Sequence, residues 1–127
     1  DYSLWLPGQT GDAAKALVME PPTAGYEECC YYYDMQEKDG LARAGIFNGE
    51  TGVILRYDKR ALPCFTQWKM MGQTDYVLGL EPGNCTPDGR DVLRREGRLA
   101  FLAPGAEAVT AVEFCFADNK ARFEEEF

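Results

Sequence analysis

The sequence predicts an all-β domain built from antiparallel strands. Between residues 28 and 116, short apolar runs alternate with the turn-forming pairs Asp39-Gly40, Asn48-Gly49 and Pro104-Gly105. Asp-Gly and Asn-Gly pairs between such runs are typical of hairpins, whose strands are antiparallel. We therefore expect less than a fifth of this segment to be helical. The glycine patterns of P-loop and dinucleotide-binding proteins are absent from the sequence, as are a Gly-x-Ser-x-Gly motif and a Cys–His pair, so nucleophilic catalysis of the hydrolase kind has no support.

Residues 1–26 are predicted to be a loop-rich lead-in. Residues 1–6 fit a short strand or an anchoring segment. Residues 12–19 have a helix-forming composition and an acidic start. An isolated helix of that length is marginal in water, so a loop with one helical turn is an equal alternative. Residues 21–25 contain two prolines and a glycine, and we expect them to act as a linker.

The β region, residues 27–116, contains the runs that we expect to be strands: 28–33, 41–47, 51–57, 64–71, 76–80, 98–102 and 109–116. Strand side chains alternate between the two faces of a sheet. In the fourth run, Phe65, Gln67 and Lys69 should therefore share one face, and Thr66, Trp68 and Met70 the other. One helical turn is expected over 91–96. The tail, residues 117–127, is predicted to be a frayed helix or a disordered end.

Bulk composition excludes several classes of function. The chain has 127 residues, which corresponds to one domain or part of one. It begins with Asp1 rather than Met, so a fragment of a longer domain is an alternative to a complete one. The net charge of −8 argues against binding to nucleic acid or to an anionic membrane surface, because both need clustered Lys and Arg. No apolar run approaches the roughly 18 residues of a membrane span.

The cysteines predict thiols rather than a metal site. There are five, they are scattered, and no Cys-x-x-Cys spacing occurs. The chain has no histidine that could complete a zinc site. We therefore expect no metal and no cofactor, and thiols that behave as small apolar residues. Such thiols are typical of a reducing compartment, and the predicted location is the cytoplasm.

One carboxylate occupies an unusual position. Glu81 follows an apolar run and precedes Pro82-Gly83, where the chain must leave the sheet. If Gln67 and Lys69 of the neighbouring strand lie beside it, Glu81 is suited to act as a general base or as an acceptor for sugar hydroxyl groups. The alternative is that Glu81 only pairs with Lys69 or caps the turn.

The same block carries a family resemblance. The run Gln67-Trp68-Lys69-Met70-Met71-Gly72, followed by residues 75–85, resembles the C-terminal part of the aldose 1-epimerase (galactose mutarotase-like) superfamily. It is most similar to the branch described as a domain of unknown function. Residues 21–34 and 102–116 agree, so that the resemblance covers residues 20–116. It implies an antiparallel β-sandwich that forms part of a larger mutarotase-like supersandwich, with the chain as a single domain or a C-terminal fragment.

The resemblance also implies a site and a chemistry. Mutarotation needs a base at the anomeric hydroxyl and an acid at the ring oxygen. Glu81 matches the superfamily's catalytic glutamate, but its catalytic histidine has no counterpart, and Tyr33 stands where relatives carry a site histidine. Lys69 is the alternative proton donor. Trp68 would stack on the sugar or belong to the core, and Gln67 and Asn84 would bind hydroxyl groups or make ordinary sheet and turn hydrogen bonds.

These observations predict an aldose 1-epimerase-like carbohydrate-active domain that binds a small sugar on a concave surface shared by Gln67, Lys69 and Glu81. A non-catalytic carbohydrate-binding module and a structural β-sandwich fragment are the alternatives. The full mutarotase-like fold is more than twice as long as this chain. We therefore expect an apolar sheet face that needs cover from a homodimer or from a missing N-terminal portion.

Overall fold

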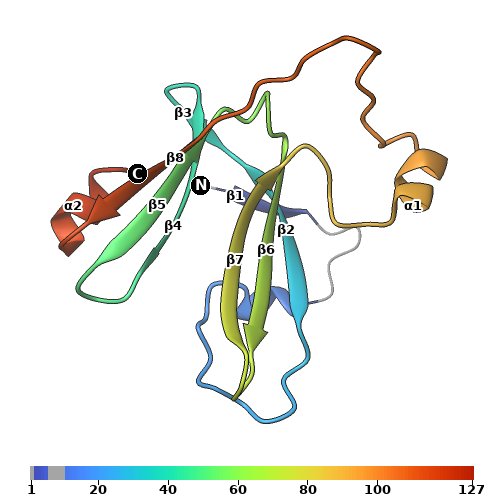
Figure 1. Ribbon diagram of the computed structural model, residues 1–127. Coiled ribbons are helices and arrows are strands. Elements are labelled where there is room, and N and C mark those ends of the chain that lie inside the picture. Colours follow the sequence, from blue (N-terminus) through green and yellow to red (C-terminus); the bar gives the residue numbers. More distant parts are fainter. Residues whose placement is uncertain (1, 6–10) are drawn as a thin grey trace.

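The computed structural model describes residues 2–5 and 11–127. Within them, two four-stranded antiparallel sheets form a sandwich, and the sheets are inclined to one another (Figure 1). The first sheet has the order β1 (Tyr2–Trp5), β2 (Cys29–Met35), β6 (Cys64–Met71) and β7 (Tyr76–Gly83). The second has the order β3 (Glu37–Lys38), β4 (Leu41–Phe47), β5 (Gly52–Tyr57) and β8 (Val112–Ala117). The all-β fold class is confirmed.

Two hairpin turns follow from local chemistry. Asp39 and Gly40 both have positive φ, 55° and 77°, as the tight turn between β3 and β4 requires. At the turn between β4 and β5, the side chain of Asn48 accepts hydrogen bonds from the backbone N–H groups of Glu50 and Thr51, at 2.9 and 2.8 Å. Both turns lie where the sequence predicts them.

Aromatic side chains from both sheets form the core. Tyr33 and Phe65 come from the first sheet and Tyr57 from the second, and all are at least 95% buried. The rings of Tyr57 and Phe65 stack with their centroids 6.1 Å apart. Ala42 and Ala44 of β4 belong to the same core cluster, and their small side chains allow the large rings to approach.

The chain before β2 carries one helical turn, η1 (Ala13–Lys15), which begins where Asp12 accepts a hydrogen bond from the backbone N–H of Ala14 at 3.0 Å. This confirms the alternative of a loop with one helical turn. The linker expected at residues 21–25 is tied to the sheet, because Thr23 N–H donates to the carbonyl of Met71 at 2.9 Å. Of the predicted segment 1–6, residues 1 and 6 lie outside the described residues.

The C-terminal tail forms the helix α2 (Lys120–Glu124), and it packs on β5 and β8. Asn119 begins the helix by accepting a hydrogen bond from Arg122 N–H at 2.9 Å. The ring of Phe123 lies over two glycines of the second sheet: a methyl group on Gly52 would meet it at 2.4 Å, and one on Gly45 at 3.0 Å. The helical alternative for the tail is therefore confirmed.

One predicted strand is wrong. Residues 98–102, all described by the structure, form no strand, although α1 (Arg90–Arg95) matches the predicted helical turn before them. The backbone N–H groups of Arg98 and Leu99 donate to the carbonyl of Leu93, at 2.8 and 3.1 Å, so they end the helix rather than enter a ladder. The last strand also starts at Val112 rather than at residue 109. No helix in the described part of the chain is long and apolar enough to cross a membrane.

Candidate functional site

The pairing of β6 with β7 decides which side chains meet. Thr66 is opposite Glu81, and Gln67 is opposite Leu80. Directly paired residues of antiparallel strands project from the same face. Glu81 therefore shares its face with Thr66 and Trp68, whereas Gln67 and Lys69 project from the other face. The expectation that Gln67, Lys69 and Glu81 converge on one surface is wrong.

The physical reason lies in the register. The spacing of Gln67 and Lys69 places these two side chains together on β6, but it does not determine the face from which β7 presents Glu81. The face of Glu81 depends on the four-residue connection 72–75, because this connection sets Met71 opposite Tyr76. Even-numbered residues of β6 are therefore opposite odd-numbered residues of β7. A shift of one residue would have brought Glu81 to the face of Lys69.

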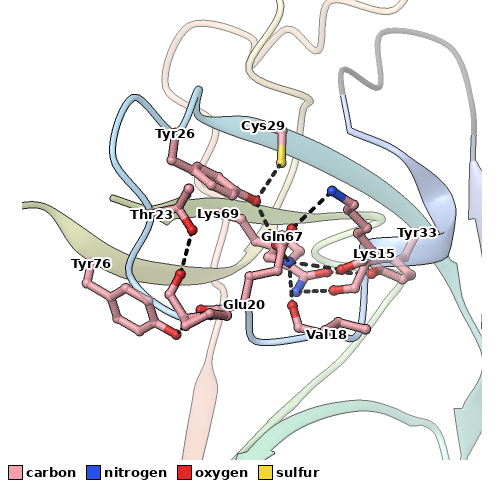
Figure 2. A network of polar contacts seen from close by, with 12 residues as sticks. Lys15, Val18, Glu20, Thr23, Tyr26, Cys29, Tyr33, Gln67, Lys69 and Tyr76 are labelled. Atoms are coloured by element: carbon pink, nitrogen blue, oxygen red, sulfur yellow. Dashed lines mark hydrogen bonds and ion pairs between the residues drawn. The ribbon is translucent and has the colours of Figure 1, made fainter. Parts of the chain in front are cut away.

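Lys69 is buried on the inner face and holds the lead-in segment (Figure 2). Its ammonium lies 2.9 Å from the carboxylate of Glu20, and it donates to the carbonyls of Lys15 and Val18 at 2.9 and 2.6 Å. The Tyr31 ring lies beneath it, 5.9 Å from the nitrogen. The Lys69 hydrogen bond is the main reason why the pKa of Glu20 lies below its ordinary value. All the acceptors are supplied by the protein itself, so Lys69 has a structural role here.

Gln67 and Tyr33 extend the same network. The Gln67 amide donates to the carbonyl of Ala16 at 2.9 Å, and its oxygen accepts a hydrogen bond from the Tyr33 hydroxyl. The structure therefore brings together three of the predicted sugar-binding residues, Tyr33, Gln67 and Lys69, on the face that Glu81 does not share. Tyr33 and Gln67 also border a cavity of about 460 Å³ near β4 and α2, but most of its other lining residues are apolar.

The outer face of the first sheet presents two rows of paired residues. Cys30, Trp68 and Gly79 lie side by side on β2, β6 and β7. Tyr32, Thr66 and Glu81 form the adjacent row. This face carries Trp68 and Glu81, the two sequence-predicted site residues that do share a surface.

The Trp68 indole is partly buried on this face, with Glu28 on one side and Glu81 near its partner Gly79 on the other. Its Nε1–H donates to a carboxylate oxygen of Glu28 at 2.8 Å. Its neighbour on β7 is Gly79, which has no side chain. The exposed Glu81 carboxylate fills part of that space, because a methyl group on Gly79 would lie 2.3 Å from the Glu81 Oε1 atom. Glu81 and the indole therefore lie next to one another on one patch of the outer face, where Glu81 is exposed and Trp68 is partly buried.

The electrostatics of this face favour protonated groups beside exposed carboxylates. Burial raises the pKa of the Cys30 thiol, and the negative charges of Glu81 and Glu28 add to the shift. Burial also raises the pKa of Tyr32. The charges of Asp88 and Arg98 act on Tyr32 as well, so the loop after β7 lies close to this end of the face. The patch thus presents exposed carboxyl groups next to a thiol whose pKa is raised.

The remaining site residue, Asn84, is exposed just beyond the end of β7. Sequence reasoning missed Glu28, Cys30, Thr66 and Gly79. The alternation along residues 28–32 indicates that Glu28, Cys30 and Tyr32 share a face. The sequence does not show that β2 pairs with β6, which places Cys30 directly opposite Trp68.

Comparisons with known proteins agree with this fold. A family model described as "Domain of unknown function (DUF4432)" matches residues 8–115. The crystal structure of a "putative aldose 1-epimerase" from Klebsiella pneumoniae subsp. pneumoniae is similar, with a TM-score of 0.74 and 26% sequence identity. The match covers 84% of this chain but 29% of that protein, so the chain spans less than a third of its length. No curated protein matches the chain.

Both matches confirm the resemblance carried by residues 67–85. The structural match shows that the sandwich has an aldose 1-epimerase-like fold. The family match extends over most of the 127 residues. The chain therefore belongs to the family described as a domain of unknown function, DUF4432.

Proposed function

We propose that the outer face of β2, β6 and β7 is part of a binding site for a small carbohydrate, in which Glu81 accepts the proton of the anomeric hydroxyl. The observation that carries the proposal is the exposed Glu81 carboxylate, which lies over Gly79 beside the Trp68 indole. An aromatic plate next to a carboxylate offers both kinds of contact that a sugar ring needs. The apolar C–H face of the ring packs on the indole, and its hydroxyl groups donate to the carboxylate.

The chemistry would be that of an aldose 1-epimerase. A base removes the anomeric proton, an acid protonates the ring oxygen, and the ring opens and closes again with either configuration. A well-placed base contributes about 10²–10⁴-fold to the rate. The reaction class is taken from the Klebsiella protein, and the 26% sequence identity to that protein supports it.

A second candidate is sugar binding without catalysis. The chain has no histidine, and Tyr33 and Lys69, the two alternative acids, project from the inner face. The Cys30 thiol is a protonated group beside Glu81, and a thiol is a weak hydrogen-bond donor. This observation favours a binding module in which Glu81 recognises hydroxyl groups.

Polarimetry tests the first candidate. Freshly dissolved α-D-galactose changes its optical rotation slowly, and the wild-type chain should accelerate that change. Glu81→Gln should abolish the acceleration because the amide cannot take up the proton. Glu50→Gln is the matched control: Glu50 is an exposed carboxylate in the turn between β4 and β5, away from the proposed site, and its loss should leave the rate unchanged.

An NMR titration separates the two candidates. The indole N–H resonance of Trp68, assigned with Trp68→Phe, should shift saturably when galactose is added. A saturable shift without acceleration supports the binding module. If the wild type shows neither a shift nor an acceleration with galactose, glucose or other aldoses, the chain has only the structural role.

A further inference from the structure

We propose that Glu28 is a positioning residue that holds the Trp68 indole as a stacking plate for an uncharged sugar ring. The inference rests on the proposed function, because it concerns the ligand class of the same patch. It is based on the hydrogen bond between Trp68 Nε1–H and the Glu28 carboxylate, which measures 2.8 Å. Hydrogen bonds to an ionised acceptor are about twice as strong as those between neutral groups.

The neighbours of Trp68 explain why this hydrogen bond matters. In a sheet, the residues directly opposite a side chain contribute most to its packing. For Trp68 these residues are Cys30 on β2 and Gly79 on β7, which are both small. Neither provides a wall that would fix a ring as large as indole. The Glu28 hydrogen bond therefore contributes much of the restraint on the ring.

The position of Glu28 suits this role. It directly precedes β2 (Cys29–Met35) and lies two residues before Cys30, the partner of Trp68. Its backbone lies next to the first ladder pair of β2, Cys29 with Lys69, and its exposed side chain reaches across to Trp68 on the neighbouring strand. Glu28 thus approaches the indole from the side of β2, whereas on the side of β7 the Glu81 carboxylate lies above Gly79.

The charges indicate which sugars fit. Glu28 and Glu81 are both exposed, and both act electrostatically on Cys30 between them. The loop cation near this face, Arg98, is engaged by Asp88 and Glu96 at 3.1 and 2.6 Å. A phosphate or carboxylate group on the sugar would meet two negative charges, whereas neutral hydroxyl groups would meet two acceptors. The patch therefore favours neutral pyranoses.

The test uses three variants and two ligands, methyl β-D-galactopyranoside and galactose 6-phosphate, with binding measured by NMR titration. Glu28→Ala removes the acceptor and should weaken binding of the neutral glycoside roughly tenfold, as the loss of one charge-assisted hydrogen bond would. It should also shift the Trp68 indole N–H resonance without any ligand. Glu28→Gln keeps an acceptor oxygen and should bind the glycoside within about twofold of wild type.

Glu27→Ala is the control, because it removes an exposed carboxylate one residue away and should change neither observable. The phosphate ester should bind wild type more weakly than the neutral glycoside and should gain affinity in Glu28→Gln. Equal binding of the glycoside by wild type and Glu28→Ala would overturn the inference and leave the proposed function intact. A wild type that binds neither ligand, while Glu28→Ala still shifts the indole resonance, would overturn the proposed function and the ligand class derived from it.

Discussion

The carboxylate of Glu81 lies over the backbone of Gly79, so close that a methyl group on Gly79 would come within 2.3 Å of the Glu81 Oε1 atom. We expect Gly79→Ala to displace the carboxylate from the Trp68 indole. The fold should survive, because the displaced atom is the end of a flexible, exposed side chain. Sugar binding should fall about as far as in Glu81→Gln, as measured by NMR titration. Unchanged binding would show that this position of Glu81 is not required.

The Cys30 thiol reports on the same carboxylate. Burial and the charge of Glu81 both raise its pKa, so less thiolate is present at a given pH than for an ordinary cysteine. Glu81→Gln removes one negative charge, lowers the pKa of Cys30 and should speed its alkylation by iodoacetamide at pH 8 roughly two- to threefold. Mass spectrometry of the peptide containing Cys30 measures this rate. Cys115, on β8 of the other sheet, serves as the internal control.

Loss of the buried cation should destabilise the fold. Lys69→Met would leave the carbonyls of Lys15 and Val18 without their donor, and we expect a loss of about 3 kcal/mol in the free energy of unfolding. Urea denaturation followed by circular dichroism measures it. Lys120→Met, in which the lysine side chain is 74% exposed, should change stability by less than about 0.5 kcal/mol. Equal effects of the two substitutions would contradict the structural role of Lys69.

The ion pair between Lys69 and Glu20 predicts that the stability of the fold depends on pH. The pKa of Glu20 is lowered in the folded state, mainly by the Lys69 hydrogen bond. The stabilisation is therefore fully present above the unfolded-state pKa, which is about 4.3, and is lost as the pH falls through the lower folded-state value. The melting temperature of the wild type should exceed that of Glu20→Gln at pH 7, and the difference should shrink below about pH 4.5. A difference that stays constant down to pH 2.5 would contradict this linkage.

Self-association is expected at the edge of the second sheet. Phe114 and Phe116 project from the same face of β8, the last strand of the described sheet, and are 60% and 75% exposed. Light scattering should show concentration-dependent dimers that Phe116→Ser weakens. Phe101→Ser, which removes a ring that is 77% exposed in an irregular segment, should have a smaller effect. A wild type that stays monomeric at every concentration would argue against this interface.

Much of the fold could be predicted from local patterns. The strands β4 and β6 have the predicted bounds, because apolar alternation and the turn at Asn48-Gly49 are local signals. The prediction of a strand at residues 98–102 was wrong for a non-local reason. Its Leu99 and Phe101 alternate as in a strand, but no strand in the described part of the chain pairs with the segment, and its first backbone N–H groups bond to Leu93 of α1.

The site was harder to predict than the strands. The residue types were informative, because Trp68 and Glu81 do share a face. The face itself depends on the register between β6 and β7, where one residue of slip reverses every side chain. The role of Lys69 depends on Glu20, which lies 49 residues earlier in the chain. The residue pattern of a single segment shows neither the register between β6 and β7 nor the contact between Lys69 and Glu20.

The Lys69 network also has a consequence for hydrogen exchange. Residues 11–25 carry little regular structure, so fast amide exchange would be the ordinary expectation. Here a buried ammonium, the Gln67 amide and the Thr23 N–H bond attach this segment to β6 at several points. To detach this segment, the molecule must leave the buried Lys69 ammonium without the carbonyl groups of Lys15 and Val18 that accept its hydrogen bonds. We therefore expect the amides of Ala16, Val18 and Thr23 to exchange together with those of β6, as one cooperative unit with the sheet.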